Sequence, residues 1–179
     1  RKFGAAGDFV TAPEISDLFG RTLARQIAEV LATTGGDILE LGPGTGRLAV
    51  QILGELARLD RLPDRYCLLD VSAELRERQR ERIADEIPEL AGRAIWLDAL
   101  PDAFHGVVVA NEVLDAVPVS LVVWRDDGLH ERGVGVEGET FVWIDRPLAD
   151  GPVRAQAEAL SVQAPYLTEI APRVTALVA

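Results

Sequence analysis

The chain has 179 residues, of which 48% are hydrophobic, and its formal net charge is -11. This length favours one domain with one ordinary hydrophobic core. The 29 acidic residues outnumber the 18 basic ones, and no local basic stripe offsets them, which argues against a nucleic-acid partner. No apolar stretch approaches the ~20 residues of a membrane span, and the single cysteine, Cys67, excludes a disulfide framework.

The first part of the chain predicts alternating helices and strands. Residues 11–14 (Thr-Ala-Pro-Glu) have the pattern of a capping box, and apolar residues at helical spacing then predict an amphipathic helix that ends near Gly35-Gly36. Ser72 is placed to cap a charged helix that runs to about Ile87. Short apolar runs predict strands at 38–41, 66–71, 94–97 and 107–110. The last of these runs is rich in Val, which is typical of a strand buried on both faces.

After Pro118 the pattern changes. Alternating apolar runs are separated by Asp127-Gly128 and Glu137-Gly138, which predicts an antiparallel meander over residues 120–146. An Ala-rich stretch from Val153 to Ala164 predicts a helix. We therefore expect an α/β fold in which a parallel sheet, with helices on both faces, is joined to a β-meander.

A glycine loop, Gly42-Pro43-Gly44-Thr45-Gly46, follows the first predicted strand. In parallel sheets, ligands bind beyond the carboxyl ends of the strands, and glycines let the backbone approach a ligand closely. The dinucleotide fingerprint needs a sixth-position glycine, where this chain has Arg47, and no Gly-Lys-Ser/Thr follows. Pyrophosphate is therefore the weaker candidate ligand. We predict that a nucleoside cofactor contacts Gly42, Gly44, Thr45 and Gly46.

Acidic side chains accompany this loop. Glu40 lies two residues before Gly42, where it could hold a cationic group such as a sulfonium that carries an α-amino group. Asp70 ends the second predicted strand, a position from which an acid can accept hydrogen bonds from ribose hydroxyls. Asp98 follows the third strand and could meet an adenine amine. The structural alternatives are solvated strand-end acids for Glu40 and Asp70, and a turn-forming role for Asp98.

Polar residues also follow the fourth predicted strand, at Asn111, Glu112 and Asp115. The Asn111 amide could contact a substrate. Glu112 or Asp115 could bind a cationic nitrogen and take the proton that a nucleophile sheds. In the alternative interpretation, Asn111 and Asp115 cap a short helix that leads to Pro118.

Two further features favour structural roles. His105 and His130 lack the partner spacing of a metal site, so we expect no metal. The arginines between residues 76 and 82 alternate with glutamates, which is typical of a solvated helix with ion pairs. We assign no chemistry to either feature.

Three motifs make the chain resemble the MidA-like family of methyltransferases, which includes mitochondrial complex I assembly factors. They are residues 7–16 (GDFVTAPEIS), 40–48 (ELGPGTGRL) and 111–119 (NEVLDAVPV), and shorter matches extend the resemblance across most of residues 1–146. The resemblance implies a Rossmann-like class I fold that binds S-adenosylmethionine. We expect a single domain over 1–179, with an N-terminal segment (1–35), a cofactor-binding core (36–119), the meander (120–146) and a C-terminal segment (147–179).

The same resemblance implies roles for particular residues. Gly42, Gly44, Gly46 and Asp70 would bind the cofactor, and the Asn111-Glu112 pair would face both cofactor and substrate. The segment 7–16 would close over the same cleft, where Asp8 and Glu14 are candidate substrate contacts; either acid could instead be a helix cap. Because the family continues past residue 179, we also expect the chain to be incomplete and the sheet to gain later strands.

The activity that the resemblance implies is methyl transfer to a protein side chain, arginine by similarity. A respiratory complex I subunit is the implied substrate, an acidic surface would suit a basic protein, and a homodimer is a further expectation. The implied location is the cytoplasm for a bacterial protein and the mitochondrial matrix for a eukaryotic one. The alternatives are a non-catalytic assembly factor that keeps the cofactor fold, and an NAD-dependent oxidoreductase, which Arg47 disfavours.

Overall fold

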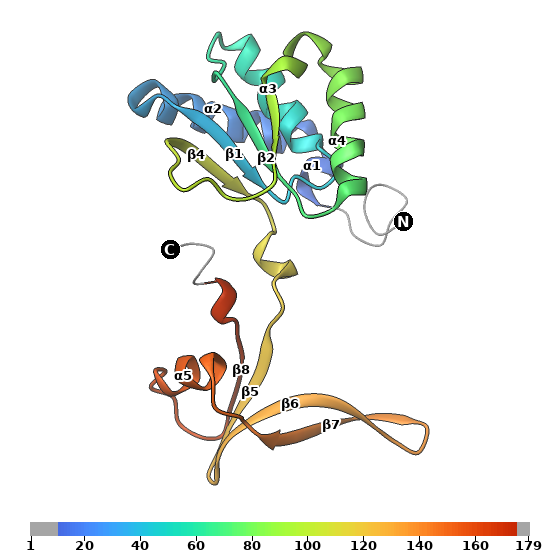
Figure 1. Ribbon diagram of the computed structural model, residues 1–179, viewed down its shortest axis with the longest axis vertical. Coiled ribbons are helices and arrows are strands. Elements are labelled where there is room, and N and C mark those ends of the chain that lie inside the picture. Colours follow the sequence, from blue (N-terminus) through green and yellow to red (C-terminus); the bar gives the residue numbers. More distant parts are fainter. Residues whose placement is uncertain (1–10, 175–179) are drawn as a thin grey trace. The chain divides into compact units, whose positions relative to one another are not determined.

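The computed structural model describes residues 11–174, which form parts of two compact units with their boundary between Val113 and Leu114. The first unit holds a parallel sheet of strand order β3-β2-β1-β4, and the second an antiparallel sheet of order β7-β6-β5-β8 (Figure 1). This arrangement confirms the predicted α/β class with a separate antiparallel meander. Among the described residues, no helix is long and apolar enough to cross a membrane.

The four predicted strands of the first unit are all present. They are β1 (Asp37–Leu41), β2 (Tyr66–Leu69), β3 (Ala94–Leu97) and β4 (Gly106–Ala110). Helix α3 (Arg47–Arg58) connects β1 to β2, and α4 (Ala73–Glu86) with the 3-10 helix η1 (Pro88–Arg93) connects β2 to β3. Ser72 caps α4 as predicted, because its hydroxyl accepts a hydrogen bond from the Leu75 amide at 3.3 Å.

One face of the parallel sheet carries the core. Its strand residues include Ile38, Tyr66, Leu68 and Val109. They pack with buried residues of α2 (Asp17–Thr34), α3 and α4, so in the described chain these three helices share that face. On the opposite face Val108 is 54% exposed. In the described residues, α2, α3 and α4 therefore cover one face of the sheet and not both as predicted. The prediction that β4 is buried on both faces is wrong, because these helices cover only the face that carries Val109.

The predicted N-terminal helix is interrupted at Ser16. Helix α1 (Ala12–Ile15) is a single turn, and the side chain of its N-cap residue Thr11 makes no capping hydrogen bond. Helix α2 starts directly afterwards, capped by the Ser16 hydroxyl, and ends at Gly35 as predicted. The predictions of a capping box and of one continuous helix are thus wrong, because the Glu14 carboxylate bonds to another segment and Ser16 supplies the cap of α2.

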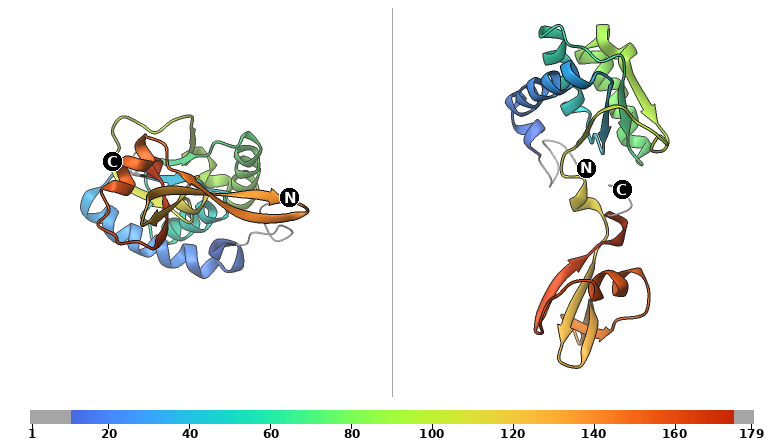
Figure 2. Two further views of the ribbon diagram at one scale, coloured as in Figure 1. Left: turned by 90° about the horizontal axis from the view of Figure 1, so that it is seen from below. Right: turned by 90° about the vertical axis from the view of Figure 1, so that its left-hand side faces the viewer.

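The second unit contains the predicted meander and one further strand. Its elements are η2 (Leu114–Ala116), β5 (Ser120–Arg125), β6 (Gly128–Glu137), β7 (Thr140–Pro147), α5 (Pro152–Glu158) and β8 (Tyr166–Ile170). Strand β8 pairs with β5, and α5 packs beside β8 through Ala157 and Ile170 (Figure 2). Helix α5 ends well before Ala164, the predicted limit.

Gly106 is required by a close approach of two strands. Its φ is 139°, and a Cβ atom added there would lie 1.9 Å from the carbonyl oxygen of Asp37. Because the obstructing atom belongs to the backbone of β1, it cannot move without disturbing the sheet. We expect Gly106→Ala to lower the free energy of unfolding by about 3 kcal/mol or more, measured by urea denaturation.

Gly128→Ala is the matched control. Gly128 has a φ of 127°, and no atom of the described residues lies within 4 Å of the added carbon. This variant carries the backbone strain without the collision, so we expect a loss of only about 1 kcal/mol. Equal losses in the two variants would show that the contact between β1 and β4 is not what requires Gly106.

Candidate functional site

The glycine loop between β1 and α3 adopts a backbone that needs glycine. Gly42, Gly44 and Gly46 have φ values of 59°, 55° and 79°, in the left-handed region that side chains disfavour. The Gly42 amide donates to the Leu69 carbonyl at 2.9 Å, and Gly46 is the N-cap residue of α3. The loop therefore leads from the sheet edge to the start of a helix, whose first amides have no partner within the helix and can bind a ligand.

Gly44 is the open position of this loop. A Cβ atom added at Gly46 would lie 3.2 Å from Gln79, and one added at Gly42 would lie 3.1 Å from Cγ2 of Val113. At Gly44, by contrast, no atom of the described residues lies within 4 Å of the added carbon. The loop backbone at Gly44 is therefore free to lie against a bound molecule.

Asp70 follows β2 and is linked to the loop. Its Oδ1 accepts a hydrogen bond from the Ser72 amide at 2.9 Å, and its Oδ2 accepts one from Nε2 of Gln79 at 2.9 Å. The same Nε2 donates to the carbonyl oxygen of Gly44, also at 2.9 Å. Each carboxylate oxygen keeps a second lone pair, and Asp70 is partly exposed, so it can still accept hydrogen bonds from a pair of hydroxyls.

Glu40, in the strand that leads into the loop, is buried rather than solvated. The residue is 2% exposed, and the hydroxyl of Tyr66 donates to its Oε2 at 2.7 Å. The pKa of Glu40 is raised from 4.5 to about 7, chiefly by burial and to a smaller extent by the charge of Asp70, while the Tyr66 hydrogen bond acts to lower it. A buried carboxylate without a cation is costly, so the chemistry of Glu40 fits a positively charged ligand group.

The raised pKa of Glu40 makes stability fall as pH rises. The group titrates at about 7 in the folded protein against 4.5 ordinarily, so the folded state holds an extra proton between these values. The resulting stabilisation is complete below pH 4.5 and is lost as pH rises through 7. We expect this group to lower the free energy of unfolding by about 2–3 kcal/mol between about pH 5 and pH 8, measured with urea.

Glu40→Gln tests this assignment. Its amide still accepts the Tyr66 hydrogen bond but cannot ionise, so the variant should gain stability relative to the natural protein as pH rises. The two proteins should differ most at about pH 8 and converge towards about pH 5. A constant difference across this range would mean that Glu40 does not titrate there.

Asn111 and Glu112 lie beside the loop at the end of β4. Ala110 pairs with Leu41 at the ends of β4 and β1. The next residues, Asn111 and Gly42, therefore directly follow two neighbouring strands. Glu112 is exposed and has a φ of 55°, which is rare for any residue but glycine. Such backbone strain clusters at functional sites. The structure therefore brings Asn111 and Glu112 to the glycine loop.

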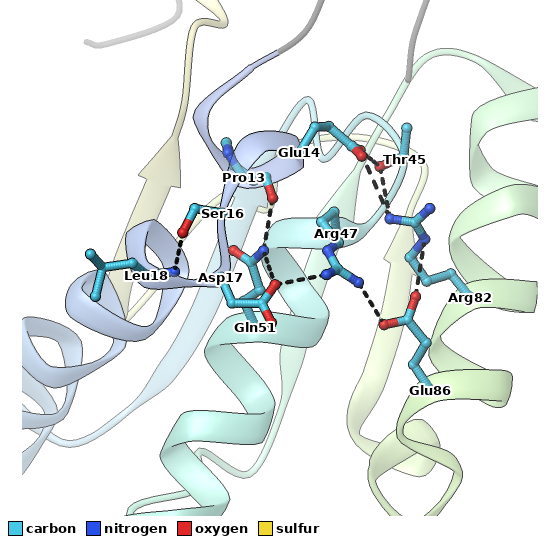
Figure 3. Close-up of polar contacts among 10 residues, drawn as sticks. All are labelled: Pro13, Glu14, Ser16, Asp17, Leu18, Thr45, Arg47, Gln51, Arg82 and Glu86. Atoms are coloured by element: carbon cyan, nitrogen blue, oxygen red, sulfur yellow. Dashed lines mark hydrogen bonds and ion pairs between the residues drawn. The ribbon is translucent and has the colours of Figure 1, made fainter. Parts of the chain in front are cut away.

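The turn of α1 is bonded to the loop by two side chains (Figure 3). The Thr45 hydroxyl donates to the Glu14 carboxylate and accepts from Nη1 of Arg82 at 3.3 Å. Arg82 also lies 3.8 Å from Glu14. Glu14, a predicted substrate contact, thus holds α1 against the loop, and the hydroxyl hydrogen of Thr45 is used within the protein. Arg82, which has no role in the sequence analysis, belongs to the support of the site.

Arg47, the residue in place of a sixth-position glycine, joins three helices (Figure 3). Its guanidinium pairs with Asp17 of α2 at 2.7 Å and with Glu86 of α4 at 2.9 Å. From α3, Nε2 of Gln51 donates to the Pro13 carbonyl at 2.8 Å. The arginine therefore has a structural role next to the loop.

Of the other predicted site residues, one is a surface acid, one belongs to the second unit and one lies outside the described residues. Asp98 is a surface acid, with its side chain 89% exposed and paired with Arg76 at 2.7 Å, and its contact with adenine stays a prediction. Asp115 belongs to η2 in the second unit, and its catalytic role stays a prediction. Asp8 lies outside the described residues. Within residues 11–174, no group of three or more His, Cys, Asp or Glu side chains could hold a metal ion.

Comparison with known proteins identifies the class. The family model described as "Putative S-adenosyl-L-methionine-dependent methyltransferase" matches residues 22–179. The chain belongs to this family, which confirms the predicted relationship and the family's cofactor.

Particular relatives agree with this assignment. The human mitochondrial protein arginine methyltransferase NDUFAF7 is 38% identical over 181 residues, and the match covers 86% of this chain and 41% of the relative. Its Caenorhabditis elegans homolog is 30% identical over 138 residues, and that match covers 65% of this chain and 32% of the relative. The crystal structure of a "likely methyl transferase" from Burkholderia thailandensis, bound to S-adenosyl-homocysteine, is similar with 46% identity and a TM-score of 0.85. The match covers 99% of this chain and 47% of that protein. The chain thus spans less than half the length of these proteins.

Proposed function

We propose that the protein is an S-adenosylmethionine-dependent methyltransferase that acts on an arginine side chain of a protein. The observation that carries the proposal is the open backbone at Gly44, linked through Gln79 to Asp70, on the loop that directly follows the strand of the buried Glu40. Asp70 can accept hydrogen bonds from the ribose hydroxyls, and the accessible main chain at Gly44 can contact the adenosyl group. The buried carboxylate of Glu40 suits the cationic amino acid part of this cofactor. The names of the curated relatives indicate arginine as the acceptor.

When bound, the cofactor supplies an electrophilic methyl group on a sulfonium. The residues of this chain then have separate tasks. Asp70 accepts the ribose hydrogen bonds, and Glu40 compensates the positive charge of the ligand. The exposed carboxylate of Glu112 binds the guanidinium of the substrate and accepts the proton that its nitrogen releases, while the Asn111 amide orients the same group.

We further propose that the substrate is a protein with basic segments, in keeping with the net charge of -11. The names of the eukaryotic relatives describe those proteins as mitochondrial. For a eukaryotic source the proposed substrate is a complex I subunit in the matrix, and for a bacterial source it is a cytoplasmic protein. A homodimer remains part of the proposal.

Two assays on the full-length natural protein test this function. Calorimetric titration with S-adenosylhomocysteine should release heat, and titration with NAD should not. Transfer of a tritiated methyl group into the proteins of a lysate from a strain that lacks this protein should then label arginine. Binding without any transfer would favour the non-catalytic assembly factor, heat with NAD would favour the oxidoreductase, and label on lysine would overturn the choice of acceptor.

A further inference from the structure

A single buried amide connects the parts of the proposed cofactor site. Gln79 is fully buried, although it lies on α4, a helix rich in charged residues. Its Nε2 donates to the Gly44 carbonyl and to Oδ2 of Asp70, and its Oε1 accepts from the indole Nε1 of Trp96, each at 2.9 Å. Gln79 therefore links the glycine loop, the end of β2 and β3.

The three partners specify a primary amide at this position. The indole of Trp96 can only donate, whereas the Gly44 carbonyl and the ionised Asp70 can only accept. A side chain between them must provide one acceptor and two donors, which among side chains of this length only glutamine does. An ionised glutamate would lack both donors, and a leucine would leave all three groups without their bonds.

Contacts on either side hold Gln79 itself in place. A Cβ atom added at Gly46 would lie 3.2 Å from Cα and Cγ of Gln79, so the glycine loop packs directly on its backbone and stem. The guanidinium of Arg80 lies over the ring of Trp96, 4.8 Å from its centroid. This cation–π contact fixes the indole that orients the amide.

We propose that Gln79 is a positioning residue for the cofactor, acting through Gly44 and Asp70. By bonding both with one nitrogen, it sets the spacing between the loop backbone and the carboxylate that accepts the ribose hydroxyls. The site is then aligned before the ligand arrives, which lowers the cost of binding. This inference rests on the proposed function of the loop and of Asp70.

A double-mutant cycle on the full-length protein tests the proposal. Calorimetry with S-adenosylhomocysteine compares the natural protein with Gln79→Leu, Asp70→Ala and the double variant. We expect each single change to weaken binding roughly tenfold, and the Gln79 change to cost only about twofold more once Asp70 is gone. The control is Ile83→Val, one helical turn further along α4 and 1% exposed, which should lower the unfolding temperature without changing the affinity.

The possible outcomes distinguish a failure of the role of Gln79 from a failure of the proposed ribose contact of Asp70. Independent effects of the Gln79 and Asp70 changes, or an equal loss of affinity in Ile83→Val, would show that Gln79 only supports the fold and would overturn the inference. An unchanged affinity in Asp70→Ala would instead contradict the proposed ribose contact. If Gln79→Leu does not fold, Gln79→Glu replaces it, because it keeps the shape and the acceptor for Trp96.

Discussion

Gly44→Ala should weaken the binding of S-adenosylhomocysteine by about 100-fold while the protein remains folded. The added methyl group meets no atom of the described residues, so it occupies the space in which we propose that the ligand lies. The φ of 55° adds a strain of only about 1 kcal/mol. Calorimetry and urea denaturation of the same variant measure the two effects separately.

Gly138→Ala controls for that strain. Gly138 lies in the turn between β6 and β7, with a φ of 62° and no atom of the described residues within 4 Å of the added carbon. It should lose a similar stability, about 1 kcal/mol, and bind the ligand as the natural protein does. If Gly44→Ala also retained full affinity, the ligand would not lie against the loop.

Glu112→Gln should lower the rate of methyl transfer by about 100-fold and leave the dissociation constant of S-adenosylhomocysteine within about twofold. The amide keeps the size of the side chain but neither attracts a guanidinium nor accepts its proton. Single-turnover transfer to an arginine peptide measures the rate, and calorimetry measures the affinity.

The matched control for Glu112 is Glu137→Gln, which changes another exposed glutamate, at the end of β6, and should leave both values unchanged. A full rate of transfer in Glu112→Gln would remove Glu112 from the proposed chemistry. A loss of affinity as large as the loss of rate would instead assign Glu112 to the cofactor.

Local patterns were sufficient for the parts of the fold that depend on local signals. Each strand of the parallel sheet is a short apolar run that ends in polar or glycine residues, and the turns of the meander are marked by Asp127-Gly128 and Glu137-Gly138. The glycine loop was predictable because three glycines in five residues directly follow a short apolar run, and all three do adopt the left-handed φ values that favour glycine.

Features that depend on contacts between distant segments were not predictable. At Ser16 the backbone is extended and the helix breaks, and the preceding turn is held by the bond of Glu14 to Thr45, 31 residues away in sequence. Strand β8 forms because β5 offers it an edge. Its own residues carry no strong alternation. The burial of Glu40 likewise depends on the helices that cover its face of the sheet.

The position of Gln79 on α4 can be recognised from the sequence. Leu75, Gln79 and Ile83 recur every four residues on α4, so the glutamine occupies a position that faces the core. A polar residue at such a position needs buried partners. Which partners it has, Gly44, Asp70 and Trp96, became known only from the fold.

A crystal structure of the full-length protein with S-adenosylhomocysteine is the most direct test of where the ligand binds. We predict that the adenosyl group contacts the main chain at Gly44 and that both ribose hydroxyls lie within hydrogen-bonding distance of the Asp70 carboxylate. A ligand bound elsewhere, with the backbone at Gly44 covered by side chains of the same protein, would contradict the account.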